Sequence, residues 1–287
     1  TKSGTAALTL SGLCSHGGLT TVSAGLLSLS NTAINIGPIT VASGATLLAL
    51  GTNAGMTING IMSPGASGST TGLLTVTDMT IPAGGRHSND LTTATTRDRI
   101  TASGAITLGG NLSLVLAGGY APAIGDTHFL VVDTGAGAVT NTYSGINQGA
   151  VITIGAYRFM VSYVGDYGSS AMSGGNDIAV RCVTNPVIAN TAAIPGATTA
   201  TLGGELLSTG GAPTTVWVWY GTNNPGATKT GWLGGGFQPA TPTYWASGLV
   251  SYAVSGLIPE TNYYYRFYAS NGAGDAWAGS SATFVTK

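Results

Sequence analysis

The stretch AALTLSGLCSHGGLTTVSAGLLSL (Ala6–Leu29) alternates apolar residues with threonine and serine, and glycines interrupt it at short intervals. Its second half, LTTVSAGLLSL (Leu19–Leu29), recurs as ITVASGATLLAL (Ile39–Leu50) and again as ITASGAITLGG (Ile100–Gly110). Each copy shows the period-two alternation of a β-strand, then a glycine turn, then a second strand. The stretch therefore predicts repeated strand–turn–strand units.

The spacing of these units indicates how they stack. If Val22, Val41, Ile58 and Val76 are equivalent inward-facing positions, successive copies lie about 18 residues apart. This spacing is close to the lower end of solenoid repeats, which run from roughly 20 to 50 residues. In a parallel β-helix, inward Leu, Ile and Val side chains stack on the next turn about 4.8 Å away. We therefore expect a parallel β-helix.

The composition supports an all-β chain and limits its partners. Gly accounts for 46 of the 287 residues, which disfavours helices. Charged residues make up 7% of the chain, against about 25% in ordinary soluble proteins, and the net charge is −1. Such a surface has no long-range field for nucleic acid and little repulsion between copies. We predict no nucleic-acid partner, and we predict self-association.

The sequence also predicts no membrane insertion. No segment approaches the run of about 18 apolar residues that a membrane-spanning helix needs. The first residues lack the charged-then-apolar order of a signal peptide. Two origins are open at this point, a processed mature form and an excised piece of a longer chain.

The segment GTAALTLSGLCSHGGLTTVSAGLLSL (Gly4–Leu29) resembles the autotransporter-associated β-strand repeat, in which Gly-x-Leu-Thr-Leu-Ser-Gly, a turn and Thr-Thr-Val-x-x-Gly precede a Leu-rich strand. The turn Cys14–Gly17 departs from the family pattern. Residues 58–76 and 97–139 are similar to the C-terminal rungs of bacterial autotransporter-like passenger domains. The resemblance covers about residues 4–183. It implies a right-handed parallel β-helix that is secreted or displayed on a bacterial cell surface.

From about Thr184 onward the composition of the chain changes: aromatic residues become dense, and all five Trp residues lie there. The segment SGLIPETNYYYRFYASNGAGDAWAGSSATFVT (Ser255–Thr286) resembles the C-terminal half of a fibronectin type III domain. The motif residues are Leu257, Pro259, Thr261 and Tyr263. The resemblance implies a tyrosine corner, whose hydroxyl bonds back to upstream backbone. We predict a β-helix over 1–183 and an immunoglobulin-like, fibronectin type III β-sandwich over 184–287.

Aromatic residues supply the candidate ligand contacts of the second domain. In TTVWVWYGT (Thr214–Thr222) the valines alternate with Trp217 and Trp219, so one strand face is core and the other carries large rings. The Gly-rich loop that follows, residues 221–245, contains further rings. The candidate contacts for a glycan or a protein are Trp217, Trp219, Trp232, Tyr244 and Trp245. The alternative is that these loop residues pack the loop onto the domain.

We nominate no catalytic residue, no metal ligand and no cofactor. The three histidines are far apart, and Cys14 and His16 form only a lone Cys-x-His. Glycosidases need two carboxylates about 5 to 10 Å apart, whereas the aspartates here are spread singly. A pair formed by Asp78 or Asp98 with a neighbour on an adjacent rung stays open. The triplet Arg97–Arg99 predicts a solvated corner with a local ion pair. SGGNDIAV (Ser173–Val180) is a single copy of a calcium-type turn, and we favour a plain glycine turn.

The two cysteines lie at opposite ends of the predicted coil. With about eight turns between them, Cys14 and Cys182 are expected on the order of 35 Å apart, beyond the roughly 7 Å that a disulfide allows. An intramolecular bridge is excluded by this geometry. Two interpretations stay open, unpaired buried thiols and an intermolecular disulfide from Cys182 of one copy to Cys14 of the next.

These observations favour a non-enzymatic extracellular structural protein, a self-assembling subunit of a bacterial surface fibre or layer with head-to-tail contacts between copies. The first rung has no polar cap, so either residues upstream are missing or a neighbouring copy covers this end. Weak charge permits close approach of copies. One alternative is a cell-surface adhesin that binds a glycan or another surface protein through the aromatic second domain. Another is a polysaccharide-degrading β-helix enzyme, which lacks a carboxylate cluster in the sequence.

Overall fold

The computed structural model describes residues 1–32, 34–65, 71–238 and 243–287, and these residues form strands, turns and loops without any helix. No described segment, accordingly, is a helix long and apolar enough to cross a membrane. The chain divides into two compact units, Thr1–Cys182 and Val183–Lys287, which we describe one after the other. The prediction of an all-β chain is confirmed.

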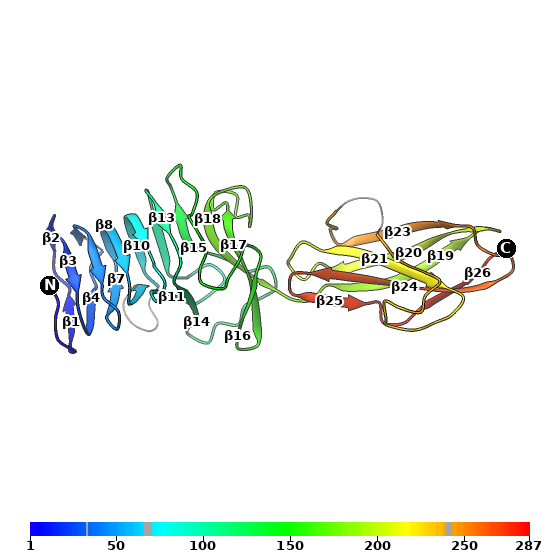
Figure 1. Ribbon diagram of the computed structural model, residues 1–287, viewed down its shortest axis with the longest axis horizontal. Coiled ribbons are helices and arrows are strands. Elements are labelled where there is room, and N and C mark those ends of the chain that lie inside the picture. The colour runs from blue at the N-terminus through cyan, green and yellow to red at the C-terminus, as the bar shows by residue number, and fades with distance from the viewer. Residues whose placement is uncertain (33, 66–70, 239–242) are drawn as a thin grey trace. The chain divides into compact units, whose positions relative to one another are not determined.

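Short strands make up the first unit (Figure 1). They are β1 (Ala7–Leu10), β2 (Ser15–His16), β3 (Thr20–Val22), β4 (Leu26–Leu29), β5 (Asn35–Ile36), β6 (Ile39–Val41), β7 (Thr46–Ala49), β8 (Gly51–Ile58), β9 (Ile61–Pro64), β10 (Leu73–Thr80), β11 (Arg86–Leu91), β12 (Arg99–Ala102), β13 (Ile106–Thr107), β14 (Asn111–Leu116), β15 (Thr127–Asp133), β16 (Val151–Ile154), β17 (Tyr157–Gly165) and β18 (Asp177–Val183).

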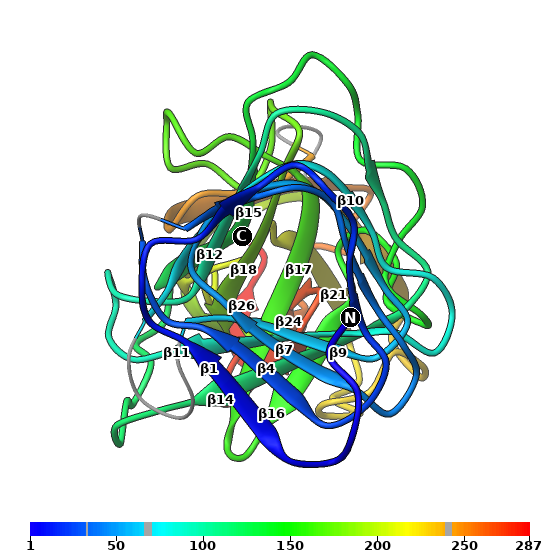
Figure 2. The ribbon, with the colours of Figure 1, turned by 90° about the vertical axis from the view of Figure 1, so that its left-hand side faces the viewer.

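These strands form a β-solenoid. One sheet has the order β1-β4-β7-β9-β11-β14, and each neighbouring pair in it is parallel. A second, twelve-stranded sheet includes β2, β5, β8, β10, β12 and β15 in that order from its N-terminal end. Figure 2 looks onto the N-terminal turn and shows the later strands stacked behind it. The prediction of stacked strand–turn–strand units is therefore confirmed.

The register agrees with the sequence repeat in the first turns and departs from it later. Val22 pairs with Val41 and Val41 with Ile58, as the spacing predicts. Val76 does not continue this row, because its partners are Asn53 and Ala102. The connections between strands lengthen along the chain, so the coil has about five turns rather than about eight. A constant repeat length was the wrong assumption.

A ladder of inward side chains forms the centre of the solenoid. Leu27 pairs with Leu47, Leu47 with Met62, and Met62 with His87. All four side chains are at most 2% exposed. Burial of apolar surface contributes about 25 cal/mol per Å² of area removed from water, so stacked leucines stabilise each turn against the next. The apolar residues of the repeated stretch are thus the core.

The parallel coil is shorter than the predicted range 1–183. β15 pairs in parallel with β12, but its other neighbour, β18, is antiparallel to it. β16 and β17 also pair antiparallel. The prediction of parallel rungs up to residue 183 is therefore wrong beyond β15. Hairpin-like pairing takes over there because the segment from 151 to 165 folds directly back on itself.

Antiparallel strands build the second unit. They are β19 (Val187–Pro195), β20 (Thr199–Ser208), β21 (Thr215–Gly221), β22 (Gly234–Phe237), β23 (Gly248–Ser255), β24 (Asn262–Asn271), β25 (Gly274–Trp277) and β26 (Ala282–Val285). One sheet has the order β19-β20-β23 and the other β22-β21-β24-β25, with β26 also on β24. A single hydrophobic cluster draws on both sheets: Ile188, Leu202 and Val250 from the first, Val216, Tyr265 and Phe267 from the second.

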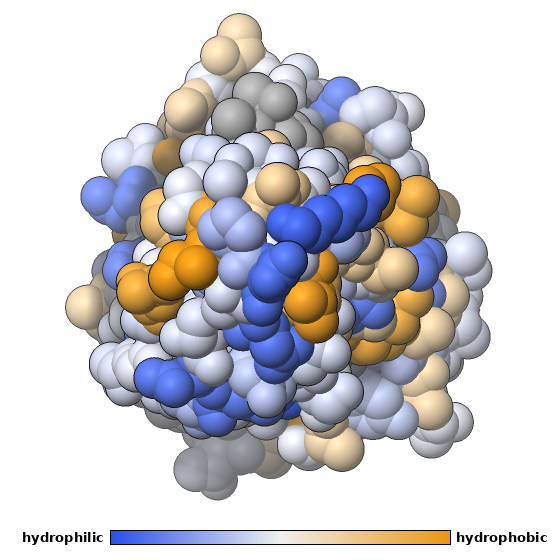
Figure 3. Space-filling model, turned by 90° about the vertical axis from the view of Figure 1, so that its right-hand side faces the viewer, coloured by the Kyte–Doolittle hydropathy of each residue, from blue (hydrophilic) through white to orange (hydrophobic). Residues whose placement is uncertain are grey.

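The surface of this unit around the C-terminus is mixed in character. Figure 3 shows apolar patches separated by hydrophilic residues on the face it presents. Ile194, Ile258 and Val285 are each more than half exposed, at 72%, 62% and 56%. Scattered apolar residues of this kind are ordinary on protein surfaces and do not mark an interface by themselves.

Candidate functional site

The motif residues of the second unit meet at the start of β24. Tyr263 is 1% exposed, and its hydroxyl accepts a hydrogen bond of 3.0 Å from the backbone N–H of Ile258. Leu257 is buried at 5% and belongs to the core cluster. Thr261 donates from Oγ1 to the carbonyl of Pro259 at 2.9 Å. The hydroxyl of Tyr263 is thus bonded to the backbone five residues upstream of it.

The aromatic face of β21 is largely covered. Trp219 is only 5% exposed, and its ring lies 4.9 Å from Trp277 and 5.7 Å from Tyr268. The Trp217 ring lies 5.5 Å from the ring of Tyr268. The Lys229 ammonium lies 4.4 Å from the ring centroid of Tyr268. The rings therefore contact each other and a lysine. Trp219 is buried rather than exposed, because the rings of Trp277 and Tyr268 and the backbone of Gly235 in β22 lie against it.

The loop candidates lie in different environments. Tyr244 is 60% exposed, whereas Trp232 is half-buried and donates its Nε1–H to the carbonyl of Thr228 at 2.8 Å. Trp245 is half-buried against the core, and its backbone N–H donates to Thr214 at 2.8 Å. Residues 239–242 of the predicted loop lie outside the described residues. The loop tryptophans hold the loop in place, and Tyr244 is the ring that faces solvent.

Both cysteines are free thiols. Cys14 is half-buried between β1 and β2, whereas Cys182, in β18, is 3% exposed. Burial raises the pKa of the Cys182 thiol, and the charge of Asp126 adds to this effect. A disulfide from Cys182 to another copy requires this side chain to leave its buried position.

The triplet Arg97–Arg99 does not form the predicted ion pair. The side chain of Asp98 is 1% exposed and accepts hydrogen bonds from the backbone N–H groups of Gly72, at 2.8 Å, and Asp90, at 3.1 Å. Burial raises its pKa to about 7, against the opposing effect of these two bonds. Side chains alternate across an extended strand, so Asp98 points inward and its two arginine neighbours point out. The local ion-pair prediction was wrong for this reason.

The two arginines line a groove of about 260 Å³ on the solenoid. Arg99 lies beside Leu73 in the paired strands β12 and β10. Its Nη1 donates to the Tyr167 hydroxyl at 2.5 Å, and its guanidinium lies 5.0 Å from that ring centroid. The other lining residues are Thr71, Thr95, Thr96 and Arg97. Threonine hydroxyls, two guanidinium groups and one phenol therefore surround the groove.

A short hairpin holds one wall of the groove. Leu91 and Arg97 form an antiparallel bridge, and Thr96 accepts through its carbonyl from the hydroxyl of Thr92 at 2.9 Å. Arg97 donates from Nε to the carbonyl of Phe129 at 3.3 Å and from Nη1 to that of Thr95 at 3.1 Å. Because these bonds form within the chain itself, the wall is positioned before any ligand arrives.

Neither guanidinium of the groove has a carboxylate partner among the described residues, and no acidic residue occurs in 33, 66–70 or 239–242. Burial lowers the pKa of Arg97, and the positive charge of Arg99 lowers it further. The Nε of Arg99 is shielded from solvent and has no acceptor among the described residues. The groove thus carries a local positive charge from two arginines, although the net charge of the chain is −1.

Two carboxylates that are distant in sequence do come together. Asp177 accepts at Oδ1 from the backbone N–H of Asp133 and at Oδ2 from that of Tyr167, both at 2.7 Å. Asp133 accepts from the N–H of Gly135 at 2.8 Å, and burial raises its pKa. Both are at most 7% exposed. Backbone amides occupy them, so this pair holds loops together and does not face a substrate cleft.

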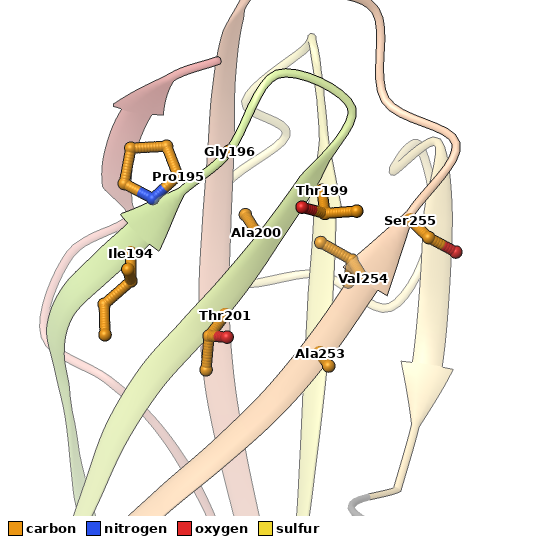
Figure 4. Close-up of a pocket in the computed structure, with 9 residues that line it drawn as sticks. All are labelled: Ile194, Pro195, Gly196, Thr199, Ala200, Thr201, Ala253, Val254 and Ser255. Atoms are coloured by element: carbon orange, nitrogen blue, oxygen red, sulfur yellow. The ribbon is translucent and has the colours of Figure 1, made fainter. Parts of the chain in front are cut away.

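The remaining candidates are also structural. In the predicted glycine turn, Asn176 donates to the carbonyls of Gly135 and Gly137 at 3.1 and 2.9 Å. No group of three or more His, Cys, Asp or Glu side chains among the described residues could hold a metal ion. A hollow of about 490 Å³ lies on the second unit between β19, β20 and β23, and its lining is small and uncharged (Figure 4). Its described lining contains hydroxyl groups but no carboxylate, histidine, cysteine or lysine.

Sequence reasoning missed the groove because its parts are far apart in the chain. Tyr167 lies 68 residues from Arg99. The signal that was present is two arginines flanking one aspartate, in a chain with only nine Lys and Arg residues. Strand alternation at Arg97–Arg99 would have placed the charges on opposite faces. No protein-family model and no curated protein sequence matches this chain.

Proposed function

We propose that this chain is a non-enzymatic structural protein, secreted or on a bacterial cell surface, whose copies assemble head-to-tail into a fibre or layer. The solenoid is the shaft of this assembly and the second unit a junction or decoration. The bacterial and extracellular parts of the proposal rest on the resemblance of the repeat. The assembly part rests on the first turn of the solenoid.

The observation that carries the proposal is the exposure of Leu8. Leu8 pairs in register with Leu27, which pairs with Leu47. These two partners are 2% and 0% exposed, whereas Leu8 is 42% exposed. Leu8 therefore extends the row of inward leucines onto β1, where a further parallel strand can cover it. Leu13 and Leu19 in the same turn are 83% and 62% exposed.

Edge geometry supports a head-to-tail contact. β1 forms one edge of the six-stranded sheet and β14 the other. All strands of this sheet run parallel, so β1 of one copy can continue the sheet beside β14 of another without reversing direction. Contacts between two different surfaces of the same chain produce open filaments when the rotation does not close. The unpaired N–H and C=O groups of an edge strand are a template for such pairing.

We also propose that the solenoid is right-handed and that the second unit is an immunoglobulin-like β-sandwich of the fibronectin type III kind. Support for the second assignment comes from two antiparallel sheets that share one core, and from the bond between Tyr263 and Ile258. A tyrosine near the start of the corresponding strand, bonded to upstream backbone, is typical of such sandwiches.

Negative-stain electron microscopy and sedimentation of the full chain test the assembly. The wild type is expected to form filaments or sheets whose amount rises with concentration. Leu8→Lys is expected to abolish them, because a charge at this position has no partner in a stacked interface. Leu249→Lys is the matched control, since Leu249 is 77% exposed and lies in the second unit.

Particles that stay monomeric at every concentration would contradict the proposal, as would equal assembly by Leu8→Lys and wild type. Comparison with and without reductant separates stacking from disulfide bonding. Filaments that survive reductant are held by strand pairing, whereas filaments that dissolve in reductant require Cys14 and Cys182.

A second candidate function is adhesion through the aromatic second unit. The observation that favours it is Tyr244, which is 60% exposed beside the half-buried Trp245. Tyr244→Ala then lowers binding of the full chain to a neutral glycan array, whereas assembly is unchanged. If Tyr244→Ala loses assembly but still binds the glycan, the result supports the structural function instead.

A further inference from the structure

The groove between Arg97, Arg99 and Tyr167 has the composition of a site for an anion. Its two guanidinium groups have no carboxylate partner among the described residues, and the positive charge of Arg99 contributes to lowering the pKa of Arg97. An anion placed between them removes this repulsion. Guanidinium groups bind carboxylate, sulfate and phosphate oxygens with paired N–H bonds.

The threonines and the leucine of the lining indicate which class of anionic ligand fits the groove. Three threonines contribute hydroxyl groups that both donate and accept hydrogen bonds, and Leu73 is the single aliphatic side chain. A peptide needs apolar pockets for its side chains, and this groove has none among its described lining residues. A nucleic acid needs a long basic stripe, whereas the whole chain has nine Lys and Arg residues. Hydroxyl-rich walls around two cations suit an acidic sugar.

We propose that this groove binds the anionic group, carboxylate or sulfate, of an acidic polysaccharide. Arg97 and Arg99 hold the oxyanion, and the threonine hydroxyls take the neighbouring sugar hydroxyls. Tyr167 positions Arg99 through the bond from Nη1 to its hydroxyl. The site would let the protein attach to an acidic glycan layer.

The proposal is independent of assembly. Its residues belong to β10 and the segment just before it, to β12, to the hairpin between β11 and β12, and to the loop after β17. None of them belongs to the first turn, which carries the stacking surface proposed above. Binding by the Leu8→Lys variant therefore tests the groove even when assembly fails, so failure of one proposal is distinguishable from failure of the other.

Isothermal titration calorimetry of the full chain at low ionic strength is the test. The probes are a galacturonic acid hexamer for carboxylate, a heparin-derived hexasaccharide for sulfate, inorganic sulfate for a free oxyanion, and maltohexaose as the neutral control. We expect an acidic hexamer to bind, maltohexaose not to bind, and added salt to weaken the affinity. Which acidic hexamer binds more tightly identifies the oxyanion.

Arg99→Gln removes one charge and is expected to raise Kd about tenfold or more, because charge-assisted bonds are the strong ones. Arg99→Lys keeps the charge without the planar fork and is expected to give an intermediate Kd. Arg86→Gln is the matched control, since Arg86 is an exposed arginine of the same unit outside the groove. Far-UV circular dichroism checks that each variant is folded.

Three results would overturn the inference. The first is an unchanged Kd in folded Arg99→Gln, and the second is an equal loss in Arg86→Gln. The third is inorganic sulfate binding as tightly as either hexamer, since the sugar then contributes nothing. A loss confined to the Arg99 variants, with the hexamer bound more tightly than sulfate, supports it.

Discussion

Asp98 and Arg99 are consecutive in the chain and face opposite ways. The Asp98 carboxylate is 1% exposed and accepts from the amides of Gly72 and Asp90, whereas Arg99 donates outward to Tyr167. The bond from Gly72 also fixes the backbone between Thr71 and Leu73, two lining residues of the groove. Buried Asp98 thus positions the backbone of the groove without pairing with the positive charges of Arg97 and Arg99.

The stability of the solenoid should depend on pH in two opposing ways. Burial raises the pKa of Asp98 to about 7, so the stability that its neutral form contributes is lost as pH rises from about 4 to about 7. Burial lowers the pKa of His87 and of His128 to about 4, so the stability of their neutral forms is lost as pH falls from about 6.5 to about 4. Asp98 therefore offsets part of the acid sensitivity of the histidines.

Asp98→Asn should remove that offset. The free energy of unfolding of this variant is expected to fall more steeply than the wild-type value between pH 7 and pH 4.5, by a few kcal/mol. Urea titrations followed by far-UV circular dichroism measure it, and Trp fluorescence identifies the second unit's transition because all five Trp lie there. Asp275→Asn, in the second unit, is the control. Equal slopes for Asp98→Asn and wild type would refute the assignment.

A charge in the leucine ladder should destabilise the solenoid. Leu47 is 0% exposed, so Leu47→Asp places a carboxylate without a partner in the core and is expected to cost several kcal/mol of unfolding free energy. Leu13→Asp makes the same chemical change at a side chain that is 83% exposed and should have almost no effect. The two variants are compared by thermal unfolding followed by circular dichroism. Equal midpoints would show that Leu47 is not a core residue.

The hydroxyl of Tyr263 should stabilise the second unit. Tyr263→Phe keeps the ring and removes the acceptor for the N–H of Ile258, for an expected cost of about 1 to 2 kcal/mol. Tyr264→Phe, at the next position and half-buried, is the control and should cost less than about 0.5 kcal/mol. Urea unfolding followed by Trp fluorescence reports on this unit. The prediction fails if the two variants are equally stable.

The two thiols should react at different rates. Cys14 is half-buried, whereas Cys182 is 3% exposed and burial raises the pKa of its thiol. A thiol-reactive chromophore is therefore expected to label Cys14 quickly in the native chain and Cys182 only on unfolding. Cys14→Ser should remove the fast phase. A fast phase that persists in Cys14→Ser would place Cys182 at the surface and favour the intermolecular disulfide.

The sequence predicts local structure well wherever the signal is local. Period-two alternation and glycine turns led to the strands, and the row Val22, Val41 and Ile58 pairs as expected. The same reasoning failed at Val76, because nothing local reveals how long a connection becomes before the chain returns to the stack. The change from parallel to antiparallel pairing after β15 was missed for the same reason.

The candidate sites also divide into those that a local sequence signal predicts and those that depend on contacts between distant residues. The tyrosine at 263 could be placed from its motif, since its partner Ile258 is five residues away. The burial of Trp219 could not, because its cover includes Trp277, on a different strand. The groove joins residues near 71, 97 and 167, and no spacing in the chain connects them.

The sequence by itself determined an all-β chain with a stacked, glycine-punctuated first part and an aromatic second part, because alternation and turn chemistry act over a few residues. Only the tertiary structure decided which way the charges of Arg97, Asp98 and Arg99 point and what meets them. Their surroundings depend on contacts between turns of the solenoid. Such contacts form when the chain has closed whole turns, and they are set by connection lengths that leave no periodic mark in the sequence.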